Sequence, residues 1–386
     1  MGPIGPVMSD LSSSRPTWAE INLTNLVHNY RVMKEHLGEG VAIMPALKAD
    51  AYGHGAVECA RSLENEGAAW FGVALPEEGL ALRRSGIKTA VLCLGGFWEG
   101  QEDILVEHRL TPVIFRLDLL ERLNLAARSA RVIVDYHLKV DTGMGRLGVP
   151  HADLRSFLDH ARAFENTRLD GVMTHLASAD LSERREFTER QIGLFEEALG
   201  VVRSGGHEPR WIHMANTAGA HAYRDSHGNL VRLGGSLYGL WRDVTDRTRE
   251  PLKWRPVMAL HTRIGLLKSV PSGTPLGYGS TFVTRRESRI ATLPIGYEDG
   301  LSRALSNRGH VVVRGHIAPI VGRVSMDLTL IDVTDVPGAD VGDKAVVIGE
   351  DGSSQITAEE VAGQIGSLSY EVTCGISERV PRMYIR

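Results

Sequence analysis

A single lysine, Lys48, ends an apolar run in the segment "LKADAYGHG" (47–55). A lysine held at the mouth of a buried strand is costly to desolvate, and the same desolvation tunes its amine for nucleophilic attack. Because the amine of free lysine has a pKa near ~10.4, attack on a carbonyl needs a lowered pKa or a permanent Schiff base. The competing interpretation is a lysine whose ammonium group simply reaches solvent. Lys48 alone does not decide between the two.

The segment "LKVDTGMGRLG" (138–148) carries a cation among glycines. Gly143, Gly145 and Gly148 match the GxGxxG pattern, so a dinucleotide-binding turn is one alternative. Two observations argue against it: four strand-and-helix units precede the segment, and Arg146 puts a bulky cation inside the tight turn. In an ordinary loop, the glycines would let Arg146 approach an anionic group such as a carboxylate. A surface ion pair is the remaining interpretation of Arg146.

Two further side chains could transfer protons. His175, in "MTHLASAD" (173–180), is either an acid–base group or a structural histidine, which is the commoner case. Tyr278, in "LGYGST" (276–281), places a phenol between two glycines, and plain turn chemistry explains that segment equally well. The 15 histidines show no HExxH or comparable ligand spacing, so we expect no metal site.

Small and hydroxylated residues form a candidate phosphate site. Thr217 offers a hydroxyl, and Gly234 and Gly235 would bring backbone N–H groups close to phosphate oxygens. An ordinary glycine turn is the alternative. Arg232 lies two residues before Gly234, so on a strand the two face the same way. An amine, a phosphate cradle, two cations and a phenol together suit pyridoxal 5′-phosphate (PLP), which acts as an electron sink for an amino acid carbanion.

These side chains need a scaffold, and the first half of the chain supplies eight short apolar runs separated by helical patterns. The runs are 41–47, 70–75, 90–96, 111–115, 131–140, 169–176, 211–216 and 230–235. Residues 76–86 and 183–206 are typical of the helices between them, with acids or an apolar face at helical spacing and glycine at the end. Eight such units favour an α/β fold with a (β/α)8 barrel of the TIM type, and an open doubly wound sheet is the alternative.

The second half has a different texture. The segment "RDVTDRTREPLKWRP" (242–256) is charged and punctuated by proline, which suits a domain junction. Beyond it, β-branched runs predict a mainly β domain with one clear helix at 357–366, where Thr357 and Glu360 are spaced as a capping box. We therefore expect a flexible leader at 1–16, a barrel at 17–248 and a mainly β domain at 249–386.

The composition excludes several classes of protein. The 43 Lys and Arg residues against 47 Asp and Glu give a net charge of −4, which offers no basic surface for nucleic acid or an anionic membrane. The three cysteines are far apart and form no CxxC pair, so a disulfide framework is not expected. No apolar run reaches the ~18 residues of a membrane span, and the first residues lack the pattern of a signal peptide. We expect a soluble, cytoplasmic protein.

The motifs together resemble those of the alanine racemase family. The motifs are "ALKADAYGHG", "LKVDTGMGRLG", "THLASAD", "HMANTAG", "LGYGST", "PIGYEDG", "GRVSMD" and "RVPRMY", and they occur in the family's order from about Trp18 to Tyr384. The resemblance implies a PLP barrel followed by a mainly β domain, a head-to-tail homodimer with shared active sites, and a first strand (17–23) that packs with the β domain. It also implies interconversion of L- and D-alanine for cell-wall (peptidoglycan) precursors.

The resemblance assigns roles to individual residues. Lys48 would hold the cofactor and act as one base, and Tyr278 from the other subunit would act as the second. Arg146 and the Met326 backbone would bind the substrate carboxylate. The remaining cofactor contacts would be Tyr52, His175, Asn216, Thr217, Arg232, Gly234, Gly235 and Tyr370.

Among these, Arg232 would face the pyridine nitrogen, where many other PLP enzymes place a carboxylate; an always-charged donor there favours racemisation over decarboxylation. Lys139 matches a position that is often carbamylated, and Tyr297, Arg303 and Arg323 match residues of the substrate access channel.

Three positions depart from the family pattern, namely Gly235, Ser325 and Glu298. They leave the reaction intact but put the choice of substrate in doubt. The alternatives are a racemase of broader specificity, a PLP-barrel decarboxylase and a non-catalytic PLP carrier. A carrier built as a single barrel would lack the β domain that supplies Tyr278.

Overall fold

The computed structural model describes residues 15–245 and 252–386. Most of the expected leader and the middle of the expected junction (246–251) lie outside these residues. The chain forms two compact units. The barrel unit comprises Val27–Ala51 and Gly55–Trp254, and the β unit comprises the residues up to Leu26, Tyr52–His54 and Arg255–Arg386.

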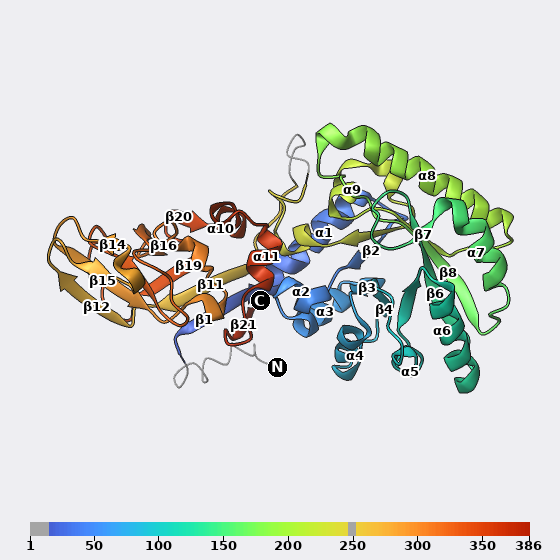
Figure 1. The fold of residues 1–386 in the computed structure, drawn as a ribbon, viewed down its shortest axis with the longest axis horizontal. Helices are drawn as coiled ribbons and strands as arrows, with labels where there is room; N and C mark the ends of the chain where they lie inside the picture. The colour runs from blue at the N-terminus through green and yellow to red at the C-terminus, as the bar shows by residue number, and fades with distance from the viewer. Residues whose placement is uncertain (1–14, 246–251) are drawn as a thin grey trace. The chain divides into compact units, whose positions relative to one another are not determined.

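The barrel unit contains the eight expected parallel strands. They are β2 (Ala42–Pro45), β3 (Trp70–Val73), β4 (Ala90–Cys93), β5 (Thr111–Ile114), β6 (Val134–Asp141), β8 (Thr167–Met173), β9 (Trp211–His213) and β10 (Leu230–Leu233). Hydrogen-bonded ladders run β3-β4-β5-β6-β8-β9 and β10-β2. A bridge between Ala46 and Gly72 joins β2 to β3, and the Arg232 N–H donates to the Ala215 carbonyl between the ends of β9 and β10. The circle of strands is therefore closed, and the expectation of a (β/α)8 barrel is confirmed (Figure 1).

Helices follow the strands and surround the barrel. They are α1 (Leu23–Leu37), α3 (Ala56–Asn65), α4 (Pro76–Arg84), α5 (Glu102–Glu107), α6 (Leu117–Ala130), α7 (Leu154–Ala161), α8 (Arg185–Ser204) and α9 (Thr217–Ala222). The segment α2 (Lys48–Tyr52) is a left-handed turn and not a regular helix. The expected apolar face of α8 is buried, because Ile192, Phe195, Leu199 and Val202 all lie in the core. Inside the barrel, Met44, Trp70, Leu92, Val113 and Met173 form one apolar cluster. This packed interior fixes the strand ends that carry the candidate site.

The β unit is built from mixed and antiparallel sheets. One sheet has the order β17-β16-β19-β11-β1-β21, with β20 paired to β19, and a second has the order β12-β15-β18. The strands of the first are β1 (Thr17–Asn22), β11 (Met258–Arg263), β16 (His310–Val313), β17 (His316–Pro319), β19 (Lys344–Asp351), β20 (Ser354–Ile356) and β21 (Arg382–Ile385). The others are β12 (Leu266–Val270), β15 (Ser288–Leu293), β18 (Thr329–Asp332) and the small hairpin β13 (Pro275–Leu276) and β14 (Phe282–Val283).

The N-terminal strand belongs to this β unit. Strand β1 lies between β11, to which it is antiparallel, and the last strand, β21, to which it is parallel. The expected helix is present as α10 (Ala358–Ile365), and Thr357 and Glu360 exchange the hydrogen bonds of a capping box. The sequence analysis missed a second helix, α11 (Ser369–Cys374). With only six residues, α11 is too short to show a helical period.

Candidate active site

Lys48 begins a left-handed turn at the mouth of the barrel. The next three residues have φ and ψ between 49° and 55°, and Tyr52 also has a positive φ of 55°. None of the four is glycine, so each is destabilised by roughly 1–2 kcal/mol relative to a right-handed conformation. Runs of this kind persist only where surrounding contacts fix them, and they gather at functional sites. The turn presents the Lys48 side chain directly after β2.

Hydrogen bonds from neighbouring elements hold this turn. The Ala49 N–H donates to Glu78 Oε1 of α4 at 2.7 Å. The Asp50 carboxylate accepts from the Ala56 N–H at 2.7 Å, at the first residue of α3. Glu78 also accepts from the Ala74 N–H. The left-handed turn is therefore held at both ends by carboxylates, and neither carboxylate was identified from the sequence.

Arg232 of β10 is buried in the barrel interior, and its guanidinium donates four hydrogen bonds to neutral acceptors. Its two terminal nitrogens donate to the carbonyls of Thr174, His213 and Met214 at 2.8–3.1 Å and to His213 Nδ1 at 3.0 Å. A longer contact of 3.3 Å reaches His175 Nδ1. Across residues 15–245 and 252–386, no carboxylate pairs with Arg232 and no acceptor is assigned to its Nε–H. The guanidinium is thus fixed with one N–H left for a ligand.

The barrel mouth gathers positive charge. The amine of Lys139 is buried, and its pKa is lowered to about 8 by desolvation and then by the cations Arg232, Arg146 and Lys48. Desolvation and the same cations lower the pKa of His175 well below its usual value. Burial alone lowers the pKa of Arg232 to about 9, so this side chain stays charged at neutral pH. Such a site attracts an anionic cofactor and an anionic substrate.

The loop after β6 carries Arg146 but does not bind a dinucleotide. The Asp141 carboxylate accepts from the N–H groups of Gly143 and Gly145, which closes the loop on itself. Gly148 then leads into the short strand β7 (Val149–Pro150), which pairs with β6. A dinucleotide-binding turn must open a helix, so that interpretation of the GxGxxG match is wrong.

The candidate phosphate cradle forms at the ends of β9 and β10. The Gly234 N–H donates to Thr217 Oγ1 at 2.9 Å, which joins the two loops. Asn216 caps α9, because its side chain accepts from the Gly219 N–H. Gly235 begins a 3-10 turn (Gly235–Tyr238), and its N–H has no acceptor in the described part of the chain. The Gly234 N–H and the Asn216 oxygen are therefore used internally, and the Thr217 hydroxyl and the Gly235 N–H are the donors that phosphate oxygens would meet.

The β unit brings together the predicted residues of its own half. Tyr278 lies on a short turn between Gly277 and Gly279, both with positive φ, and its side chain is 71% exposed. The position of a Cβ on Gly279 lies 3.4 Å from a terminal nitrogen of Arg323, so the Tyr278 turn packs against the Arg323 side chain. A Cβ at this distance would make an ordinary contact, so Gly279 is favoured by its positive φ, which residues with a side chain rarely adopt.

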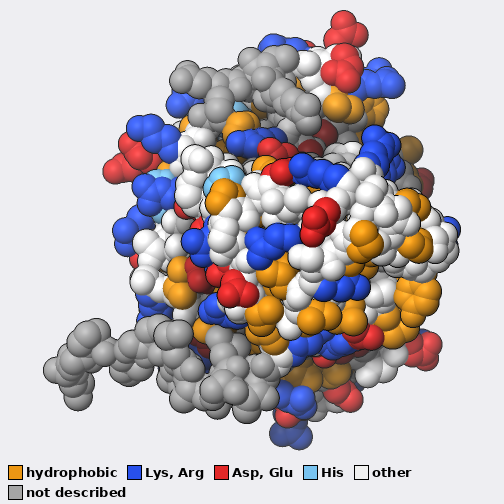
Figure 2. Space-filling model, turned by 90° about the vertical axis from the view of Figure 1, so that its left-hand side faces the viewer, with side chains coloured by type: hydrophobic (Ala, Val, Ile, Leu, Met, Phe, Trp, Pro, Cys, Tyr) orange, Lys and Arg blue, Asp and Glu red, His pale blue; other side chains and the backbone are white. Residues whose placement is uncertain are grey.

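Met326 and Tyr297 lie on two interlocked segments. The Tyr297 N–H donates to the Ser325 carbonyl at 3.0 Å, and the next N–H donates to the Met326 carbonyl at 3.1 Å. Arg303 lies near these segments in the fold. Its carbonyl accepts from the Ser306 hydroxyl, and the Ser306 oxygen accepts from the Val324 N–H. The Met326 side chain is 50% exposed, like the others on this surface. Figure 2 shows hydrophobic side chains gathered among arginine and lysine side chains at the end of the β unit.

Tyr52 and Tyr370 form an aromatic pair in the β unit. Their ring centroids are 5.1 Å apart with the planes at 66°, and burial raises the pKa of the Tyr52 phenol. The position of a Cβ on Gly53 lies 2.2 Å from the Thr373 carbonyl oxygen, so only glycine fits where the two segments meet. Two tyrosines far apart in sequence therefore lie side by side in the β unit.

The sequence analysis missed two buried histidines below Arg232. His213 contacts Arg232 and also His137 of β6, whose Nδ1 lies 2.9 Å from His213 Nε2. A signal existed in the sequence, because His137 precedes Lys139 by two residues on a strand and so faces the same side.

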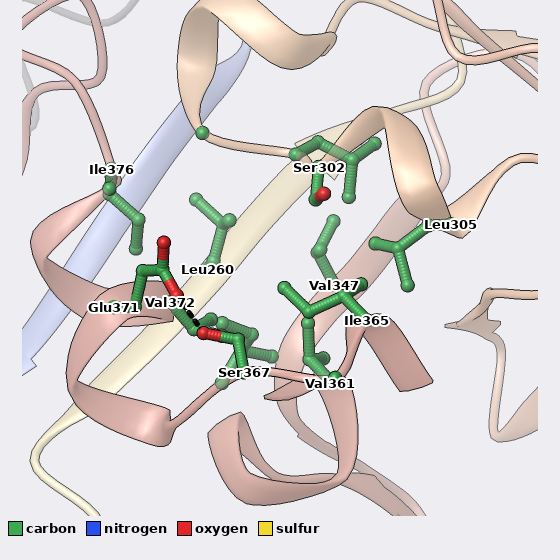
Figure 3. Close-up of a pocket in the computed structure, with 15 residues that line it drawn as sticks. Leu260, Ser302, Leu305, Val347, Val361, Ile365, Ser367, Glu371, Val372 and Ile376 are labelled. Atoms are coloured by element: carbon green, nitrogen blue, oxygen red, sulfur yellow. Dashed lines mark hydrogen bonds between the residues drawn. The ribbon is translucent and has the colours of Figure 1, made fainter. Parts of the chain in front are cut away.

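A separate cavity of about 450 Å³ lies within the β unit (Figure 3). Apolar side chains from α10, α11 and the first sheet line it, and at one side the Ser367 hydroxyl donates a hydrogen bond to the Glu371 carboxylate. It contains none of the predicted site residues. Within the described residues, no cluster of ligating side chains could hold a metal ion. No helix among them is long and apolar enough to span a bilayer.

The residues present fit PLP. Lys48 supplies an amine at the strand end, Arg232 an unassigned Nε–H, and Thr217 and Gly235 donors for phosphate, in a mouth of positive charge. The fold and the site thus define a PLP-dependent barrel enzyme. Models of the alanine racemase N-terminal and C-terminal domains match residues 21–241 and 257–384. The chain belongs to the alanine racemase family.

Relatives support the same assignment over nearly the whole chain. The alanine racemase of Geobacter sulfurreducens is 43% identical over 96% of this chain and 98% of its own, and that of Halothermothrix orenii is 42% identical over 96% and 97%. The solved alanine racemase of Clostridium difficile covers 96% of both chains at 34% identity with a TM-score of 0.92. The Bartonella henselae enzyme, with covalently bound pyridoxal phosphate, covers 96% of this chain and 100% of its own at 28% identity and a TM-score of 0.85.

Proposed function

We propose that this protein interconverts L- and D-alanine, with Lys48 and Tyr278 as the two bases. The observation that carries the proposal is Arg232, a buried guanidinium with neutral acceptors and one N–H left over. A guanidinium can only donate a hydrogen bond, so it leaves a ring nitrogen that it faces without a proton. Bound PLP supplies the electron sink that makes the α-proton acidic. Limiting that sink favours return of the proton to the same carbon, which is racemisation.

The two bases work on opposite faces of the substrate. Lys48 would hold the cofactor covalently, and its amine would remove or return the α-proton on one face of the substrate. Tyr278 does the same on the other face, because each enantiomer exposes its proton to one base only. His175 lies beside Arg232 and is kept neutral by burial and by neighbouring cations, and with Nδ1 facing Arg232 its other ring nitrogen can donate a hydrogen bond to a phenol oxygen.

Arg146 and the Met326 backbone N–H bind the substrate carboxylate in this proposal. Lys139 keeps Arg146 in place as a carbamate. Its lowered pKa of about 8 leaves a share of neutral amine near neutral pH, and only the neutral amine adds to carbon dioxide, with an N–C bond formed and a proton released. Growth on ¹³C-bicarbonate should give a carbamate signal in the ¹³C NMR spectrum. A Lys139→Ala variant should lack it.

The remaining predicted contacts complete the site. Tyr52, Tyr370, Thr217, Gly234 and Gly235 bind or shape the phosphate cradle, with Asn216 holding the start of α9 beneath it. Tyr297, Arg303 and Arg323 line the access channel, on the surface of the β unit that also carries Tyr278.

The site is shared between two copies of the chain. The support is the exposure of Tyr278 and Met326 at 71% and 50%, since a base that must exclude water needs a covering surface.

An alanine-like substrate is supported by a solved relative. The Bacillus anthracis alanine racemase, which has bound L-Ala-P, is 35% identical with a TM-score of 0.90 over 97% of this chain. We place the enzyme in the cytoplasm, in line with its few, scattered cysteines.

Incubation of the holoenzyme with L- or D-alanine in D₂O tests the reaction. Racemisation predicts loss of optical activity together with deuterium at Cα, measured by proton NMR. Release of carbon dioxide would point to a decarboxylase, and neither change would point to a PLP carrier. Chiral chromatography of products from a panel of L-amino acids then separates an alanine racemase from one that also takes serine.

Subunit mixing tests the shared site. A Lys48→Ala chain and a Tyr278→Phe chain are each inactive alone, but a mixed dimer contains one site with both native bases if Tyr278 acts across the interface. Co-refolding equal amounts should then recover about a quarter of the native activity for a two-fold dimer. No recovery, with mixed dimers present by mass spectrometry, would mean that Tyr278 serves its own chain.

A further inference from the structure

We propose that His137 is a positioning residue for Arg232, acting through His213. The two histidines form a chain of neutral imidazoles, each protonated on Nε2, that fixes the guanidinium with its Nε–H toward the ligand. Only the identity of that ligand rests on the proposed function.

The tautomers follow from the direction of donation. The Arg232 guanidinium has no acceptor, so His213 Nδ1, 3.0 Å away, must accept and carry no proton. A neutral His213 then has its proton on Nε2. That N–H points to His137 Nδ1 at 2.9 Å, so His137 Nδ1 accepts as well. The proton of His137 therefore lies on Nε2, and every bond in the chain runs away from Arg232.

Neither histidine is charged at working pH. Burial, followed by the charge of Arg232, lowers the pKa of His137 to about 3. Burial, His137 and Arg232 lower the pKa of His213 well below its usual value. A protonated His213 would lose its acceptor and face the guanidinium as a second cation. The two histidines thus present the lone pair of His213 Nδ1 to Arg232 without adding a second positive charge.

Packing fixes the His137 ring. The ring is fully buried, and its centroid lies 5.1 Å from that of Trp70 and 5.0 Å from that of His213. The position of a Cβ on Gly171 lies 2.7 Å from three ring atoms, so the neighbouring strand leaves room for the imidazole only because it has no side chain there. The ring therefore lies directly against the backbone of β8 at Gly171.

His137 is a poor choice if its role is only to fill space. Its Nε2 is buried and has no hydrogen-bond partner in the part of the chain that the structure describes. An unsatisfied buried donor is destabilising by about 1–3 kcal/mol, whereas an apolar side chain of similar size would carry no such penalty. Groups of this kind call for a functional explanation. The acceptor that His137 presents to His213 provides one.

The first test measures the tautomers directly. Holoenzyme and cofactor-free enzyme labelled with ¹⁵N-histidine are compared by long-range ¹H–¹⁵N NMR at pH 6–8, with His137→Asn and His213→Asn used to assign signals. We expect both His137 and His213 as neutral Nε2–H forms in both samples. A protonated ring, or a proton on Nδ1 of His213, would overturn the inference. This result does not depend on the reaction, so it can stand or fall apart from the racemase proposal.

The second test uses kinetics. His137→Leu removes the acceptor, and we expect kcat to fall by about 10- to 100-fold with little change in KM, as for a group displaced by about 1 Å. His137→Asn keeps an acceptor oxygen near the Nδ1 position and should retain kcat within about threefold of the native value. Equal losses in the two variants, or no loss in either, would contradict the positioning role.

A matched control separates positioning from stability. His261 of β11 is also buried, lies 5.3 Å from the ring of Trp18, and has a ring nitrogen without a partner in the described residues. His261→Leu should change the melting temperature but leave kcat unchanged. If His137→Leu does not fold, the Asn variant and the NMR measurement still decide the question.

Discussion

The candidate site residues of the barrel unit are buried and hydrogen-bonded, whereas those of the β unit are exposed. In the barrel unit, Arg232, Lys139 and Thr217 are at most 5% exposed, and the hydrogen-bond donors of Arg232 are matched to fixed acceptors. In the β unit, Tyr278 and Met326 are at least half exposed on short turns. The first half is preorganised by its own fold. The second presents its groups on an exposed surface. In the shared site that we propose, a partner would have to cover these groups before they could exclude water.

This difference separates two kinds of functional residue. A buried group such as Arg232 is held by the packing and hydrogen bonds around it, so its neighbours contribute to its function. An exposed group such as Tyr278 is positioned by a short turn between two glycines, which packs against the Arg323 side chain. Substitutions near Arg232 in the barrel unit should therefore lower kcat even where they do not contact the ligand. Substitutions near Tyr278 in the β unit should act only at the substituted position.

The largest effect is expected for Lys48. Lys48→Ala should abolish covalent attachment of the cofactor and lower activity by at least the 10²–10⁴-fold that one acid–base group contributes. Borohydride reduction of the native holoenzyme, followed by peptide mapping, should place the pyridoxyl label on Lys48. A label on another lysine would remove the basis of the barrel half of the site.

Tyr278→Phe should lower racemisation by about 10²–10⁴-fold while leaving the fold intact, because the phenol is exposed and donates no structural hydrogen bond in the described residues. Proton exchange at Cα should persist from one enantiomer only, since Lys48 still serves one face. Deuterium incorporation from each enantiomer measures this asymmetry. Full racemisation in both directions would rule out the two-base assignment.

Gly171→Ala should show how far a barrel substitution carries. The new Cβ would displace the His137 ring, so we expect kcat to fall by about tenfold and stability to fall by about 1–3 kcal/mol. Gly193→Ala is the matched change at a half-buried position of α8, where nothing lies within 4 Å of the new Cβ. It should leave kcat unchanged and raise stability by up to about 1 kcal/mol. Urea unfolding and steady-state kinetics measure both.

The smallest effect should appear in the pH dependence of stability. The pKa values of His137 and His261 are lowered by burial to about 3 and about 4. Between those values and the usual pKa near 6.5, the unfolded chain binds more protons than the folded chain, so stability falls as the pH falls through this range. His261→Leu should flatten the pH dependence between about 6.5 and 4, and melting temperatures at several pH values provide the measurement. An unchanged slope would mean that His261 is protonated in the fold.

The sequence was sufficient for the features with a period or a fixed spacing. The eight strands and the apolar face of α8 follow from alternation and helical spacing, and Thr357 and Glu360 follow from the capping box. The family motifs directed attention to Lys48 and Tyr278. The left-handed turn at 49–52 could not be predicted, because the strain lies on alanine, aspartate and tyrosine while the nearby glycines suggested an ordinary turn. Glu78, which supports the turn, is 30 residues from Lys48 in the sequence, and Ala56, which donates to Asp50, lies just outside the motif at 47–55.

Other misses have a similar cause. The role of His213 depends on Arg232 being a donor within reach, and His137 is one step further away, so only tertiary contacts identify them. The GxGxxG match failed for the opposite reason: the local pattern was right, but Gly148 is followed by a strand instead of a helix.

Strand β1 pairs with β21, so residues 17–22 and residues 382–385 lie next to each other in one sheet. During synthesis, residues 17–22 emerge long before the strands with which they pair, and this part of the sheet closes only after residues 382–385 have left the ribosome. The barrel's strands, all encoded before residue 234, need no such wait. Removing residues 382–385 would expose an edge of β1, so a four-residue segment more than 350 residues away keeps the first strand covered.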